Sequence, residues 1–188
     1  MVRPALVLCA LTLSALTLTA APAAGQDVGI HSDAFVDQIG TAQAVAIVQQ
    51  GVASATVTQR GSGQSAKVTQ AGGIGAAPRL TLNMSGLTND AVVTQSGVAV
   101  AGLQIAGTGN TVLLAQRGGV AGGANVMALV QNGIGNRAQL AQDGFGNAID
   151  LTQNNNDNAA AITQTGNNLG IKMVQDGGAR AVVVQTGK

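Results

Sequence analysis

Few side chains in this sequence could serve as an acid, a base, a nucleophile or a metal ligand. Among its 188 residues are one histidine, His31, one cysteine, Cys9, and eight acidic residues, all of them Asp. Catalysis and metal binding need several such groups to converge. The sequence therefore predicts a protein that is not an enzyme and has no catalytic residue, metal site or cofactor. Four Asp stand at different offsets from the motif described next and would not converge: Asp143, Asp150, Asp157 and Asp176.

Amide side chains, in contrast, recur along the whole chain in the element Gln-x-Gly. We call the first residue of each element an anchor, and fourteen anchors follow one another at intervals of 10 to 15 residues. Met84 and Ile105 occupy two of them, and Asn155 replaces the Gly after one Gln. The other anchors are Gln38, Gln49, Gln59, Gln70, Gln95, Gln116, Gln131, Gln142, Gln153, Gln164, Gln175 and Gln185. The glycines are Gly40, Gly51, Gly61, Gly72, Gly86, Gly97, Gly107, Gly118, Gly133, Gly144, Gly166, Gly177 and Gly187.

Short strands must position these amides. The residues four and two places before every anchor are apolar, as in Val45 and Ile47 before Gln49. Residues with a period of 2 share one face of a strand, so each anchor Gln faces inward beside two aliphatic residues, and the Gly begins a turn. A buried Gln needs partners for two donors and two lone pairs, which an identical Gln stacked about 4.8 Å away supplies as a ladder. Met84 and Ile105 are expected to be its weaker points.

Two kinds of turn alternate along the chain. The insertions at residues 73–77 and 119–123 fall only in every second interval. A column of Asn or Gln six residues before the anchors also predicts turn contacts: Gln43, Gln64, Asn89, Asn110, Asn125, Asn136, Asn147 and Asn158. The repeating unit is therefore two strands of about 22 residues, which cannot bury its apolar face unless its neighbours stack on it. The predicted fold class is all-β, a cross-β-forming β-solenoid of about seven two-stranded coils.

Three segments make up the predicted domain organisation. Residues 1–24 have a basic start, an apolar stretch and small residues near Ala23, which is typical of a secretory signal peptide, with a retained membrane anchor as the alternative. Residues 25–37 would be a mature N-terminal segment, and residues 38–188 the solenoid. Removing the leader deletes Arg3 and Cys9, which leaves eight basic residues, eight acidic residues and no cysteine. We therefore expect a neutral exported protein without a disulfide.

Composition and chain ends favour a structural role. The formal net charge of +1, two Phe, and no Tyr or Trp give neither a basic footprint nor stacking platforms, so nucleic acid is not an expected partner. The chain passes from Asp37-Gln38 into the first coil and ends one turn after Gln185, without a recognisable cap. Open coil ends expose unpaired backbone groups, and a head-to-tail contact that does not close makes a fibre.

The repeat resembles the curlin repeat, Ser-x5-Gln-x-Gly-x2-Asn-x-Ala-x3-Gln, of the subunits that form bacterial curli. Residues 131–142, Gln131-x-Gly133-x2-Asn136-x-Ala138-x3-Gln142, reproduce its core. The resemblance implies a secreted subunit of a surface amyloid fibre that acts in cell adhesion and biofilm matrix. Its implied partners are further copies of itself, a homologous curlin subunit, and an outer-membrane secretion pore with accessory factors. Residues 25–37 would be the segment that the pore machinery recognises.

Departures from the family pattern bear on which subunit this is. Aromatic residues are nearly absent, and seven coils exceed the five that are common in the family. A basic C-terminal end with Lys172, Arg180 and Lys188 leans toward the minor, nucleating subunit over the major one.

The rival interpretation is a monomeric secreted β-solenoid that acts as a binding module of the adhesin or ice-binding type. Ice binding needs outward Thr-x-Thr on successive coils, whereas Thr56-x-Thr58 is followed by Lys67-x-Thr69 and Thr81-x-Asn83. Calcium-binding nonapeptide repeats need an Asp after Gly-Gly-x-Gly. This sequence does not supply that ligand, because Gly72-Gly73-Ile74-Gly75 continues with Ala.

Overall fold

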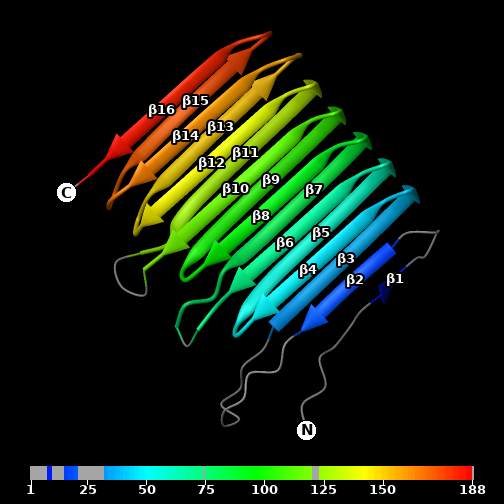
Figure 1. Ribbon diagram of the computed structural model, residues 1–188, viewed down its shortest axis with the longest axis horizontal. Coiled ribbons are helices and arrows are strands. Elements are labelled where there is room, and N and C mark those ends of the chain that lie inside the picture. The colour runs from blue at the N-terminus through cyan, green and yellow to red at the C-terminus, as the bar shows by residue number, and fades with distance from the viewer. Residues whose placement is uncertain (1–7, 10–14, 21–31, 74, 120–122, 188) are drawn as a thin grey trace, which may run out of the picture.

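The computed structural model describes residues 8–9, 15–20, 32–73, 75–119 and 123–187, and these residues form an all-β structure of sixteen strands (Figure 1). No helix occurs among them, and so none that is long and apolar enough to cross a membrane. The strands stack in two parallel sheets that lie face to face, and the chain alternates between the two. The predicted all-β fold, a β-solenoid of about seven two-stranded coils, is confirmed.

Each sheet holds every second strand in sequence order. Sheet A consists of β1 (Leu8–Cys9), β3 (Ser32–Thr41), β5 (Ala53–Ser62), β7 (Arg79–Leu87), β9 (Ala99–Thr108), β11 (Asn125–Ile134), β13 (Ala148–Asn154) and β15 (Gly170–Asp176). Sheet B consists of β2 (Ala15–Ala20), β4 (Ala44–Gln50), β6 (Ser65–Ala71), β8 (Asp90–Ser96), β10 (Thr111–Gly118), β12 (Arg137–Gly144), β14 (Ala159–Thr165) and β16 (Arg180–Thr186). We number the coils from coil 1, which is β3 with β4, to coil 7, which is β15 with β16.

The register keeps equivalent residues of the repeat directly above one another. Gln49 pairs with Gln70 in sheet B, and Gln38 pairs with Gln59 in sheet A. Met84 is in register with both Gln59 and Ile105, so the two exceptional anchors lie in the same column as the glutamines. One coil advances the chain by about 22 residues, as between Gln142 and Gln164.

The core is a thin aliphatic layer between the sheets. Side chains alternate between buried and exposed along the strands, as the period of 2 predicts, and the buried ones lie six, four, two or zero residues before an anchor. Ile47, Leu82, Leu103 and Leu140 are examples that are almost completely buried. Coil 7 differs, since its inward residues Ile171, Met173 and Val183 are only partly buried.

The turn glycines are required because successive turns touch through their backbones. A Cβ atom on Gly61, at φ +125°, would lie 2.0 Å from the carbonyl oxygen of Gly86 in the next coil. Asn155, which replaces Gly in one element, also has a positive φ, 62°. Both insertions fall in turns that lead from sheet B to sheet A, although residues 74 and 120–122 lie outside the described part.

Parts of the predicted leader also form strands. β1 pairs with β3, and β2 pairs with β4 over the register from Ala15–Ala44 to Ala20–Gln49. The rest of residues 1–24, including the predicted cleavage site, and residues 25–31 with His31 lie outside the described residues. β3 begins at Ser32, so residues 32–37 of the predicted N-terminal segment belong to the first coil.

Candidate functional site

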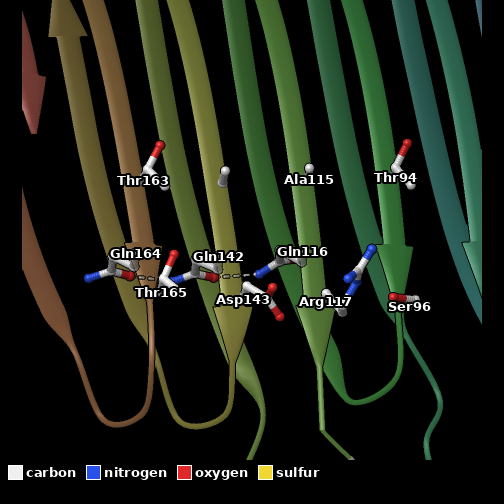
Figure 2. A pocket seen from close by; sticks show the side chains of 11 residues that line it. Thr94, Ser96, Ala115, Gln116, Arg117, Gln142, Asp143, Thr163, Gln164 and Thr165 are labelled. Carbon is white, nitrogen blue, oxygen red and sulfur yellow. Dashed lines mark hydrogen bonds between the residues drawn. The ribbon is translucent and has the colours of Figure 1, made fainter. Parts of the chain in front are cut away.

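The glutamines of sheet B form one continuous hydrogen-bonded ladder through all seven coils. In every rung the Nε2 of one Gln donates to the Oε1 of the Gln in the next coil, over distances of 2.7 to 3.0 Å. Figure 2 shows Gln116, Gln142 and Gln164 in this row. The ladder runs through Gln49, Gln70, Gln95, Gln116, Gln142, Gln164 and Gln185.

The second N–H of each of these amides ties the two sheets together. Gln70 Nε2 donates to the Ser54 carbonyl at 3.0 Å, and the other rungs repeat this contact with the start of the sheet A strand in their own coil. Both N–H groups of a buried amide are therefore satisfied, one along the stack and one across the core. Sequence reasoning did not find these carbonyl acceptors, because a backbone group has no signature in the sequence.

The ladder of sheet A is broken in the middle. Gln38 donates to Gln59 at 2.8 Å, and Gln131, Gln153 and Gln175 are joined by two bonds of 2.7 Å. Between these segments lie Met84 and Ile105, at the positions where the sequence predicts weaker points.

The break leaves one donor poorly bonded and one acceptor unpaired. Along the stack, Gln59 Nε2 meets the Met84 sulfur at 3.7 Å, and its other contact is the Ala44 carbonyl at 3.4 Å. Gln131 Oε1 is buried without a hydrogen-bond partner, because Ile105 below it has no donor. An orphaned buried carbonyl costs about 1–3 kcal/mol.

Asparagines hold the turns by a second stack. Asn110 Oδ1 accepts the backbone N–H of Asn136 at 3.0 Å, and Asn136 Oδ1 accepts that of Asn158 at 3.0 Å. The Nδ2 groups donate to turn carbonyls, as Asn110 does to Ala106 and Gly133. Asn125 and Asn147 build the equivalent contacts in the opposite turns.

Glutamine does not replace asparagine fully in this column. Gln43 and Gln64 make the Nε2 contacts to their turn carbonyls, but their Oε1 atoms are buried and have no partner. The additional methylene moves the carbonyl away from the N–H of the next coil. Together with Gln131 Oε1 these are the three orphaned side-chain atoms found in the described part of the chain, and each marks a departure from the repeat.

A shallow groove runs over the outer face of sheet B, beside the ladder (Figure 2). Its floor is lowered at Ala115 and Ala141, which lie in register between Thr94 and Thr163. Threonine and serine hydroxyls, Arg117 and Asp143 line it. These groups can donate and accept hydrogen bonds.

The remaining acidic residues do not build a metal centre in the described part of the chain, where no three His, Cys or Asp come together. Phe35 points outward and is 40% exposed, as its place between inward residues predicts. The Thr56-x-Thr58 pair lies beside Thr81-x-Asn83 in sheet A, whereas Lys67 and Thr69 are in sheet B.

No family model, curated protein or solved structure matches this chain.

Proposed function

We propose that the protein is a secreted structural subunit that polymerises head to tail into a curli-type amyloid fibre at the bacterial cell surface. The observation that carries the proposal is the open face of coil 7. β16 pairs only with β14, and β15 only with β13, in the described part of the chain. Ile171, Met173 and Val183 repeat the inward pattern but stay partly exposed, so another coil would complete their burial.

Coil 1 offers the matching face once the leader is removed. Ala34, Val36 and Gln38 in β3, and Val45, Ile47 and Gln49 in β4, have the chemistry of the coil that would follow coil 7. A contact between two different faces of identical molecules does not close, and it generates a filament. The further partners proposed, a homologous curlin subunit and an outer-membrane pore with accessory factors, rest on the curlin-like repeat alone.

The test is assembly of the chain without residues 1–24. The described core cluster lies in coils 1–7, between Val36 and Ile162 with partly buried residues up to Val183, so the truncated chain keeps it. We expect thioflavin fluorescence to rise after a lag, and fibre diffraction to give a meridional reflection near ~4.8 Å. A persistent soluble monomer without that reflection would overturn the proposal and favour a monomeric binding module.

A second experiment separates a nucleating subunit from a bulk subunit. The truncated chain is added at sub-stoichiometric ratios to a separately purified major curlin subunit. A nucleator abolishes the lag of the major subunit at low ratios. A bulk subunit shortens the lag only in proportion to the number of fibre ends that it has already formed.

A further inference from the structure

The two ends of the solenoid are chemically unlike, because the glutamine ladder has a direction. In every described Gln–Gln rung of both sheets the lower coil donates and the higher coil accepts. At coil 7, Gln185 Nε2 makes only a 3.4 Å contact with the Gly170 carbonyl. At coil 1, the amide oxygens of Gln49 and Gln38 stand where a lower rung would donate. Coil 7 is therefore the donor end and coil 1 the acceptor end.

On sheet B, the outward side chains of the two end coils are apolar and would meet across the joint. Val182 and Val184 are 80% and 70% exposed, and β16 has no partner strand on their open side among the described residues. Continuing the register of the coils would place Val184 against Val48, itself 40% exposed, and Val182 against Ala46. This contact would shield the most exposed large apolar side chains of the described chain.

Charges on sheet A favour the same joint. In coil 7, β15 has the cation Lys172 and the anion Asp176, whereas in coil 1, β3 has the anions Asp33 and Asp37 and no cation. In the continued register Lys172 would lie diagonally between the two Asp of the next molecule. Arg60 and Asp37 already form such a diagonal pair within one chain, at 4.0 Å.

Lys172 is charged at neutral pH in this setting. Its Nζ donates to Asp150 Oδ2 at 2.7 Å, and this hydrogen bond and the negative charge raise the pKa of Lys172 above its usual value. The ammonium group is exposed and can contact a second carboxylate across the joint.

We propose that coil 7 of one molecule binds coil 1 of a second copy in the register that successive coils use, with Gln185 donating to Gln49 of the next molecule. This inference rests on the proposed polymerisation and adds its polarity and register. In sheet A, Gln175 Nε2 now donates to the Ala179 carbonyl at 3.2 Å. At the joint it would donate to the Gln38 amide oxygen of the next molecule instead.

The asparagine column does not cross this joint. Ala179 and Leu169 replace Asn in coil 7, so neither turn offers a carboxamide oxygen to the next backbone N–H. The joint is consequently held by backbone pairing of the strands, the glutamine ladders, the valines and the charges. It lacks the two asparagine hydrogen bonds that coil 6 makes to coil 7.

Cysteine pairs test the register directly, because the chain without its leader contains no cysteine. Neighbouring strands lie about 4.8 Å apart, within the ~4.4–6.8 Å between Cα atoms that a disulfide spans. Fibres of the Val48→Cys/Val184→Cys variant, oxidised after assembly, should give a ladder of covalent multimers on a non-reducing gel. The matched control is Val48→Cys/Val174→Cys, whose second thiol lies on the opposite sheet and points away. This variant should give no covalent multimers on the gel.

Mixing the single variants tests the polarity. Co-assembled Val48→Cys and Val184→Cys chains should give the mixed dimer, and each variant alone should stay monomeric on the gel. Dimers of Val184→Cys with itself, or an equal ladder in the opposite-sheet control, would overturn the inference even though fibres form. If thioflavin and diffraction show no fibres for the unmodified chain, the proposed function itself fails, and with it this inference.

Discussion

Repair of the broken ladder in sheet A gives the sharpest energetic prediction. The perturbation is a double-mutant cycle of Met84→Gln and Ile105→Gln. Met84 and Ile105 are neighbours in the anchor column of sheet A, and each is 1% exposed. With both changes, the column from Gln38 to Gln175 consists of amides only. With either change alone, one break remains, and both single variants should be less stable than the parent chain because a buried apolar side chain is lost.

The two substitutions are energetically coupled, because each single change still leaves one buried amide carbonyl without a donor. Ile105→Gln gives Gln131 Oε1 a donor, but the introduced carbonyl faces Met84 and becomes the new orphan. Met84→Gln gives Gln59 a better acceptor, but Gln131 Oε1 stays unpaired. Only the double variant forms the rung between positions 84 and 105 and removes the orphan.

The expected coupling free energy is about 2 kcal/mol, of which about 1 kcal/mol is the net hydrogen bond and about 1 kcal/mol or more the relieved desolvation of the carbonyl. Urea unfolding of freshly prepared protein, followed by circular dichroism, measures the four variants. Hydrogen exchange of β9 and β11 amides gives the local value. The Met84→Leu/Ile105→Leu pair is the control and should be additive. Additivity of the Gln pair within about 0.3 kcal/mol would refute the reasoning.

Three further predictions follow from the same geometry. Gln64→Asn should raise the unfolding free energy by about 1 kcal/mol, because the shorter side chain lets its carbonyl accept the backbone N–H of Asn89; an unchanged or lower melting temperature would contradict this. Gly61→Ala should cost at least about 2 kcal/mol in thermal unfolding through backbone overlap and positive φ, whereas Gly102→Ala, whose Cβ would meet nothing within 4 Å, should be neutral. A chain that keeps residues 1–24 has β2 on the open edge of β4, so traces of it should slow fibre elongation by capping acceptor ends, and unchanged growth would argue against that role.

Much of the fold follows from the sequence, because the signals that specify it are local and repeated. The period of 2 before each anchor places residues such as Ile47 inside, and the regular Gly marks each turn. The alternation of two turn types also predicts that strands separated by about 22 residues pair, as Gln142 and Gln164 do. Each of these features recurs often enough to be read without any structure.

Other features depend on distances that the sequence does not contain. Gln and Asn look equivalent in the turn column, but one methylene decides whether the carbonyl reaches the next N–H, as the comparison of Gln64 with Asn110 shows. Thr56-x-Thr58 and Lys67-x-Thr69 are neighbours in sequence but lie in different sheets. The pairing of Ala15–Ala20 with β4 has no anchor motif to announce it.

The mass per unit length of the fibre tests the central claim most directly. In a head-to-tail stack, seven coils about 4.8 Å apart give one molecule about every 34 Å of each protofilament. Scanning transmission electron microscopy of fibres grown from the chain without residues 1–24 measures this value. The account predicts one molecule per about 34 Å, or an integer multiple for bundled protofilaments. One molecule per about 4.8 Å in a single protofilament, as for extended chains stacked in register, would contradict the solenoid subunit.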